Sequence, residues 1–478
     1  MGKVRTIVGA CAALAACSMG MYSMGAAAGE KAPYPDTGVQ LGTGWHSTRL
    51  LKTNENCVVA SQAEDRSEKR TQRFEEFTDT GSFMSSLSMS AKAKASWIIG
   101  ASGSASGSLL RTYKMDMNSL NISVDLRIAR GATYLVPKDE GPEQGNAIRL
   151  RSALVQLAEK NPIEFRRRCG DAFVSSIFLQ SGIQGVYSFY TRTQTERNEV
   201  KGKMAGAYGL FSASASAKQI LDKMSKEGRL SIHYTQLGGT GTRVATTEGE
   251  LRELVKELGT VAEGAAPVEI GITYYAELPN FPQAQNAVDQ DIGLIADQYL
   301  RLEALINAMN DMRQNRYGYG LFEAADLRRI ELLQDSAIAQ YDRLKNTLQQ
   351  CIPNDRDCVY PADLPRDDYD IRAQLPVRMI DIPDAETALN QQDQVMQQMG
   401  MLAQLPSTPA REYQMRTLEN QLAQLRRQRQ QVVLDTRFRI WIEEPSIARC
   451  NLGETAQCLS VQRRDELRMR YFNPSFGG

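Results

Sequence analysis

Two long stretches in which small polar and small apolar residues alternate dominate the pattern along this chain. The first lies at about 82–128 and the second at about 186–234. Each is too long for one ordinary strand of about 5–6 residues and too polar for a transmembrane helix. Each has room for a two-stranded hairpin, since a strand needs about 9–11 residues to cross a bilayer. The pattern therefore favours a pore-forming or membrane-perturbing protein over an enzyme.

In each strand of these predicted hairpins the apolar residues share one parity and the lysines share the other. The apolar set of the first hairpin is Leu87, Met89, Ala91, Ala93, Ala95, Trp97 and Leu109. That of the second is Val200, Met204, Tyr208, Leu210, Phe211, Ala213 and Ala215. Lys92, Lys94, Lys201 and Lys203 would face the lumen of a barrel. Alanine-rich faces bury little apolar area, so the alternative is that both stretches pack as helices on a sheet.

The remaining pattern divides the chain into a mixed region and a helical region. Strands are predicted at 120–128, 230–234 and 267–278, and helices at about 147–160 and 247–263. From residue 284 the sequence is rich in Gln, Leu, Arg and Glu with helical periodicity. Helices are predicted at about 286–313, 322–350, 384–404 and 409–434. The last carries coiled-coil spacing over a few turns, which favours a partner-binding or self-associating domain.

Composition narrows the choice of partner. The chain has 478 residues, room for about three domains of ordinary size. Its 56 basic side chains balance its 56 acidic ones. A net charge of zero gives no global attraction to nucleic acid or to anionic lipid. Any affinity for a membrane must come from shape, apolar surface or an anchor.

Residues 1–28 read as a signal peptide, with Lys3 and Arg5 before an apolar run too short to span a bilayer. Leu14-Ala15-Ala16-Cys17 resembles a bacterial lipobox, in which Cys17 would be lipidated. The alternative is ordinary cleavage near Ala26-Ala27-Ala28. We expect an exported protein, either an outer-membrane lipoprotein or a secreted one.

With Cys11 and Cys17 set aside, six cysteines remain, an even number that includes two close pairs and fits an oxidising compartment. The spacing predicts disulfides Cys351–Cys358 and Cys450–Cys458, which leaves Cys57 with Cys169. Neither close pair has the CxxC spacing of a zinc site, and the chain has only two histidines, His46 and His233. The sequence indicates no catalytic residue, no metal site and no cofactor.

A short segment between the two alternating stretches carries a family resemblance. It reads Cys169-Gly170-Asp171-Ala172-Phe173, followed by Ser181-Gly182. Its position resembles that of the signature of the membrane attack complex/perforin and cholesterol-dependent cytolysin superfamily, an aromatic-Gly-Thr-His-aromatic string followed by two glycines. Here Cys169 replaces the first aromatic, Asp171-Ala172 replaces Thr-His, and Ser181 replaces one glycine. The order of hairpin, signature, hairpin, strand and helix carries more of the resemblance than the string does.

The resemblance, which covers about residues 38–282, implies an α+β fold with a bent, twisted antiparallel sheet flanked by two helical clusters. The helical periodicity from residue 284 adds a mainly helical C-terminal domain. The resemblance also implies that each cluster unfurls into an amphipathic hairpin, that copies of the chain assemble into one barrel in a lipid bilayer, and that the glycines act at the bend. We expect this domain at 38–282, a helical or coiled-coil domain at 284–436 and a small disulfide-fixed cap at 437–478. The alternative is a non-lytic envelope or adhesion protein of the same fold, whose helical domain binds a surface receptor or another protein.

Overall fold

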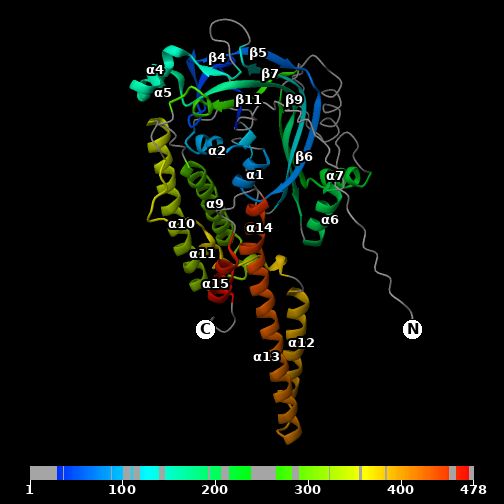
Figure 1. Cartoon of the computed structure of the whole chain (residues 1–478). Coiled ribbons are helices and arrows are strands. Elements are labelled where there is room, and N and C mark those ends of the chain that lie inside the picture. Colours follow the sequence, from blue (N-terminus) through cyan, green and yellow to red (C-terminus); the bar gives the residue numbers. More distant parts are fainter. Residues whose placement is uncertain are drawn as a thin grey trace, which may run out of the picture.

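The computed structural model describes residues 30–472, except 36, 88, 101–108, 111–112, 114–118, 139–145, 192–193, 206–214, 238–264, 283–289, 322, 355–357, 383–384 and 452–458. The centre of the fold is a bent antiparallel sheet (Figure 1). Two long strands, β7 (Ser119–Val136) and β9 (Ala172–Tyr190), pair side by side through its middle. The α+β architecture predicted from the sequence is confirmed.

Each long strand pairs with two shorter ones on its other side. β7 pairs with β6 (Lys69–Phe77) along one half and with β5 (Ser61–Asp65) along the other. β9 likewise pairs with β10 (Leu230–Leu237) and then with β11 (Ala266–Tyr274). The remaining described strands are short: β1 (Glu30–Pro33), β2 (Thr43–His46), β3 (Leu51–Asn56), β4 (Val58–Val59) and β8 (Arg149–Leu150). The sheet thus begins at Glu30, before the expected limit of 38.

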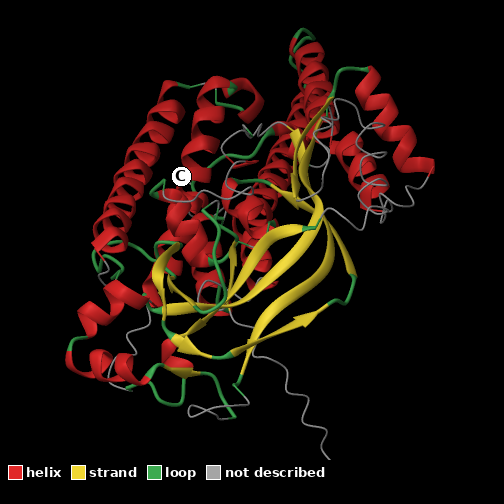
Figure 2. Ribbon diagram, turned by 90° about the horizontal axis from the view of Figure 1, so that it is seen from above, coloured by secondary structure: helices red, strands yellow, loops and turns green. Residues whose placement is uncertain are grey.

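Helices cover both faces of the sheet (Figures 1 and 2). One face carries α1 (Thr80–Ser86) and α2 (Ala91–Ile98), and the other carries α6 (Gln194–Ala205) and α7 (Ala215–Lys226). The short helices α4 (Ser152–Lys160) and α5 (Pro162–Cys169) precede β9. A 3₁₀ turn at Tyr275–Glu277 follows β11, so this strand ends earlier than the predicted 278. The helix expected from 147 begins at Ser152, because residues 149–150 pair with β4.

The C-terminal region is mainly helical, as expected. Its long helices are α9 (Gln290–Gln314), α10 (Ala324–Cys351), α12 (Ala385–Ala403) and α13 (Pro409–Phe438). Its shorter segments are Arg316–Tyr319, Ile352–Asn354, α11 (Tyr369–Arg372), Met379–Asp381, the π-helical turn Arg439–Glu443, α14 (Glu444–Asn451) and α15 (Val461–Tyr471). α12 and α13 form an antiparallel pair that projects away from the sheet (Figure 1).

Within the two alternating stretches, the segments α1, α2, α6 and α7 are helical, as the two helical clusters of the predicted fold require. These segments do not form the strands of the predicted hairpins in this structure, and their conversion into hairpins stays a prediction. Helix-start signals explain the first stretch: Asp79 makes a capping box with Ser82, and the Ser90 side chain caps α2. Alanine, the commonest residue of α2, is also the best helix former. The alternation of small residues therefore did not distinguish a strand from a helix. The helix caps indicated the helix.

Candidate functional site

The first helical cluster, α1 and α2 with Leu109, Leu110 and Tyr113, lies in a shared hydrophobic core. Phe83 stacks on Phe77 of β6 with ring centroids 4.4 Å apart, and Tyr113 meets both rings edge-on. Leu87, Ala95 and Leu109 are buried in the same core as the α9 residues Ile295 and Tyr299. The first helix of the region predicted as the domain 284–436 thus packs directly against this cluster, and the division into domains stays a prediction.

Most of the predicted apolar residues of the first hairpin lie in or against this hydrophobic core. Leu87, Ala93, Ala95 and Leu109 are buried, while Met89 and Trp97 are partly buried against the core. Ala91 is half-buried.

The two lysines of α2 also turn inward, toward partners that the sequence did not reveal. Lys94 is 7% exposed, and its Nζ lies 3.0 Å from Asp297 Oδ1 of α9. Lys92 donates to Ser47 Oγ at 2.7 Å and to Tyr274 OH at 2.8 Å. Ser47 in turn donates through its backbone N–H to Asp171 at 2.7 Å and through its hydroxyl to the same carboxylate. The signature segment is thus linked by hydrogen bonds to the first cluster.

The second cluster, α6 and α7, packs on the opposite face of the sheet. Val200 and Met204 are buried with Ile220, Leu221 and Met224 of α7. They lie against an apolar row on β7 and β9: Leu120, Ile122, Val124, Leu126, Ile183, Tyr187 and Phe189. Ala215 is the first residue of α7. Tyr208, Leu210, Phe211 and Ala213 lie outside the described residues.

Ion pairs hold this second cluster to β6 and to the start of β10. Glu76 of β6 accepts from Arg197 at 3.1 Å and from Lys201 at 2.6 Å. Partial burial opposes ionisation of Glu76, but these two cations outweigh it and lower the pKa of the carboxyl. Arg229 joins Glu196 of α6 at 2.5 Å and donates to Tyr190 O at 2.9 Å. Lys203 bonds Glu199 within α6 at 2.6 Å.

The sheet bends where β9 changes partner, from β11 at Gln180 to β10 at Gly182. A Cβ on Gly182 would lie 2.0 Å from Leu126 O, so only glycine fits. Ser181 is buried, and its Oγ meets no hydrogen-bond partner among the described residues. The predicted role of Ser181 and Gly182 at the bend stays a prediction, but Gly182 lies at the point where the partner changes.

Charged groups bridge the bend between β7 and β11. Arg127 bonds Asp125 at 2.8 Å and also Glu269, which accepts from Gln180 at 3.0 Å. Burial opposes ionisation of Glu269, but Arg127 and Lys31 outweigh it, so the pKa of this carboxyl is lowered. The bend is thereby fixed by paired charges in this conformation.

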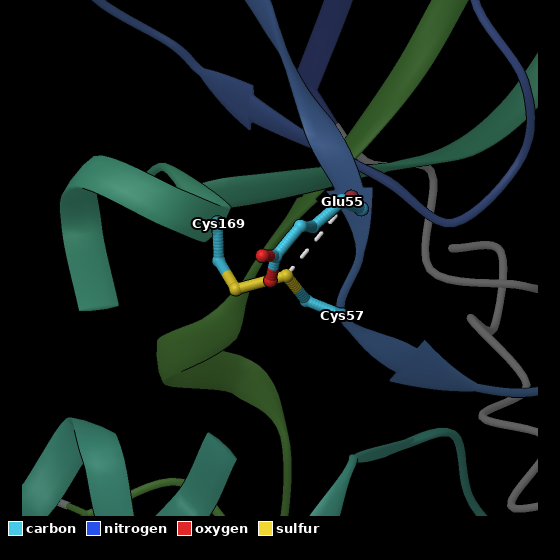
Figure 3. A group of neighbouring side chains, drawn as sticks. All are labelled: Glu55, Cys57 and Cys169. Atoms are coloured by element: carbon cyan, nitrogen blue, oxygen red, sulfur yellow. Dashed lines mark hydrogen bonds between the residues drawn. A yellow bond between two sulfur atoms is a disulfide. The ribbon is translucent and has the colours of Figure 1, made fainter. Parts of the chain in front are cut away.

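The signature segment itself is covalently fixed. Cys169 forms the predicted disulfide with Cys57 (Figure 3), and Phe173 is fully buried beside it. Gly170 has φ +77°, and a Cβ there would lie 2.1 Å from Trp45 O. Glu55 lies close to both sulfurs, but these are bonded to one another and offer no thiolate to a metal ion.

The second predicted disulfide, Cys351–Cys358, is also present. Cys17 and Cys458 lie outside the described residues, so lipidation and the Cys450–Cys458 bridge stay predictions. Among the described helices, none has both the length and the apolar character needed to cross a bilayer.

No protein-family model and no curated protein sequence matches the chain. In structure it is similar to stonustoxin, with a TM-score of 0.39 and 12% identity over 69% of this chain and 43% of that one. It is similar to the human-specific toxin intermedilysin at 0.28 and 11%, over 44% of this chain and 41% of that one. It is similar to GNIP1Aa from Chromobacterium piscinae at 0.27 and 11%, over 60% of this chain and 57% of that one.

The chain therefore spans less than two thirds of each of these proteins. Likeness at such TM-scores and identities carries no inference about activity. The resemblance of the sequence to the membrane attack complex/perforin and cholesterol-dependent cytolysin superfamily therefore stays a prediction.

Proposed function

We propose that this protein forms pores by converting its two helical clusters into β-hairpins that lengthen the central strands. The observation that carries the proposal is that β6, β7, β9 and β10 all end at the same level of the sheet. Phe77 pairs with Asn121, Ser119 with Tyr190, and Phe189 with Leu230. The first cluster joins β6 to β7, and the second joins β9 to β10. Each cluster can therefore unfold into an extension of two strands that are already paired.

Continuing the present register places both turns at glycine. Extending the Phe77 to Asn121 pairing without a slip pairs Trp97 with Ala101 and leaves Ile98-Ile99-Gly100 as the loop. Three-residue hairpin loops need a left-handed residue, and Gly100 already has φ +80°. Extending the Phe189 to Leu230 pairing leaves Gly209-Leu210 as a two-residue turn, and type II′ turns take glycine first.

The same register gathers the apolar sets of both hairpins on one face. Phe77, Asn121 and Ser188 lie on the face that the first cluster covers. Alternation from these positions carries Leu87, Met89, Trp97, Leu109, Val200, Met204, Tyr208 and Phe211 onto that face. It carries Lys92, Lys94, Lys201 and Lys203 onto the other. A barrel requires this separation, with apolar side chains toward lipid and lysines toward the lumen.

The length of the hairpin arms and the free edges of the sheet at β6 and β10 support the same proposal. Each arm would have about 18–20 residues, about 60–65 Å at 3.3–3.4 Å per residue. Strands in hydrocarbon must close into a barrel, so one subunit does not suffice. β6 and β10 have no outer strand in the half of the described sheet that carries the clusters. Copies of the chain would join β6 of one to β10 of the next in a homo-oligomer.

A non-lytic envelope or adhesion role is the second candidate, and one observation favours it. The first cluster is packed on both sides, between the sheet and α9. Its alanine-rich face would gain little from transfer into lipid. In that case the helical domain would bind a protein or a surface receptor and the clusters would stay folded. Export, and the lipid anchor at Cys17, would suit either role, and neither role is enzymatic.

Dye release from lipid vesicles, followed by electron microscopy of the same membranes, tests the proposal. We expect release together with ring-shaped oligomers. Vesicles that stay sealed and free of rings across neutral, anionic and sterol-containing lipids would exclude pore formation and leave the non-lytic role.

A further inference from the structure

The projecting pair of α12 and α13 ends in an exposed apolar tip, Met401–Tyr413. Met401, Leu405 and Tyr413 are 63%, 55% and 75% exposed. Hydrogen bonds and a helix cap fix the backbone of the tip. Arg411 donates to Leu405 O at 2.7 Å and to Ala403 O at 3.3 Å, which closes the end of α12, and the Thr408 side chain caps α13. Ordered backbone thus holds three large side chains in the solvent.

The tip also lacks charge. No charged residue lies between Asp393 and Arg411, whereas 23% of the chain is charged and about four would be expected in a segment of that length. The charges nearest the tip balance, Arg411 with Glu412 and Arg416 with Glu419, and the arginines Arg426, Arg427 and Arg429 lie at least 15 residues beyond Arg411 along α13. An anionic surface would gain nothing from this end of the molecule, whereas an uncharged amphiphilic surface would.

The base of the pair lies beside the strand ends that carry the clusters. Phe438 and Ile442 are buried with Tyr369 and Leu467, and Arg437 donates to Ala373 O at 2.7 Å. Glu76, Phe77 and Ser119 line one cavity together with Trp441 and Glu444. From this base the pair runs away from the sheet (Figure 1).

The reach of the pair can be compared with that of the proposed hairpin arms. α13 has 30 residues, about 45 Å at 1.5 Å per residue. Arms of about 60–65 Å that start at the same level would pass the tip by about 15–20 Å. A bilayer that touches the tip therefore lies within their reach, and the pair would have to tilt for the arms to cross all of its about 30 Å.

We propose that this tip is the membrane-contacting element of the protein, and that it places Met401, Leu405 and Tyr413 in the interface of a bilayer with uncharged, zwitterionic headgroups. The proposal rests on the pore-forming function for its geometry. Contact would be made by apolar side chains and the tyrosine ring, which favours the headgroup level. It would precede release of the clusters and would not require it.

The test is flotation of the full chain with phosphatidylcholine vesicles at low and high salt. We expect binding that salt does not weaken. Met401→Gln, Leu405→Gln and Tyr413→Gln together should lower the partition coefficient by about 100-fold, because three apolar contacts with lipid are lost. The matched control is Ile163→Gln, Leu332→Gln and Val461→Gln, three exposed apolar residues elsewhere, 82%, 56% and 71% exposed, and should bind as wild type.

A second readout keeps the test independent of folding. Tyr413→Trp should lose fluorescence with vesicles of brominated phosphatidylcholine, and Ile163→Trp should not. Absence of wild-type binding, or equal binding by the tip variant, overturns the proposal. Loss of a dimer in the tip variant with unchanged flotation assigns the tip to a second copy of this chain instead. Binding without dye release supports the tip and counts against the pore alone.

Discussion

The two helical clusters occupy equivalent places in the chain but are held in different ways. The first lies between the sheet and α9, in a core that the C-terminal helices share. Among the described residues, the second consists of α6 and α7 packed on the sheet, and much of the outer surface of these two helices is exposed. Freeing the second cluster requires only local unfolding. Freeing the first requires the helical domain to move, so we infer that the second is released first.

The lysines of the two clusters show the same difference. The side chains of Lys94 and Asp297 are 9% and 18% exposed, whereas that of Lys201 is 60% exposed beside Glu76. A buried pair is costly to break, because the remaining charge loses its partner in a poorly solvated site. A solvated pair contributes little. The first cluster is thus the one whose release would control a pore.

The largest expected effect comes from a disulfide that fixes the first cluster to α9. An added Cβ on Gly293 would lie 3.1 Å from the Ala91 Cβ, and slight adjustment brings this to the spacing of a disulfide. Ala91→Cys with Gly293→Cys should abolish dye release and leave vesicle binding intact. Reductant should restore release.

The single variant Ala91→Cys and the wild type, both treated with reductant, control for the native disulfides. Full leakage by the oxidised double variant would show that the first cluster stays in place during permeabilisation, and would remove it from the proposed mechanism.

The next largest effect separates the two lysine pairs. Lys94→Met keeps the length of the side chain and leaves Asp297 without its cation, so it should lower the free energy of unfolding by about 3 kcal/mol. Lys201→Met should cost less than about 1 kcal/mol, because this pair is solvated. Urea denaturation followed by circular dichroism measures both.

Lys94→Met with Asp297→Leu removes both charges and should recover most of the loss. Equal effects of the two single variants would contradict the inference that the clusters are held unequally.

The sequence predicted the fold better than the state of the clusters, and particular residues show why. The strand β7 was predicted correctly, because its residues Leu120, Ile122, Val124 and Leu126 alternate with polar residues and so share one face. Ala91–Ile98 alternates as regularly yet is helical, because alanine permits both periods and the Ser90 cap acts locally. If the segment does convert, this ambiguity is a property of the molecule, since one sequence must then satisfy two conformations.

Long-range partners were beyond sequence reasoning. The Lys94 to Asp297 pair spans 203 positions, and the Ser47 to Asp171 hydrogen bonds span 124. The Cys57–Cys169 bridge could be predicted only because the close pairs left those two cysteines over. Gly182 could be placed at a bend by resemblance, but the reason, a clash with Leu126 O, depends on the register of β7 and β9.

A smaller effect concerns helix propensity in the second cluster. Gly202 lies inside α6 with open space around its Cα, so Gly202→Ala should stabilise the helix by about 0.5–1 kcal/mol. If this cluster is released first, dye release should slow by about two- to five-fold. Gly228→Ala is the matched control. It too has open space, but its φ of +66° makes alanine destabilising, so release should quicken. Unchanged rates in both would place the second cluster after the slow step.

The smallest effect is on pH, and the two clusters should respond with opposite sign. The pKa of Glu76 is lowered from the ordinary 4.5, so its bonds to the second cluster persist above that value and are lost only as pH falls below it.

Burial raises the pKa of Glu303 of α9, which faces the first cluster at Thr80. Protonation of Glu303 removes a poorly solvated charge, so stability gained there grows as pH falls through its raised pKa toward 4.5. Acidification from neutral pH toward 4.5 should therefore tighten the first cluster and leave the second unchanged. Denaturation at several pH values measures this, with Glu303→Gln expected to flatten the rise and Glu76→Gln to leave it intact. Faster dye release in that range would show that acid acts on a group other than these two.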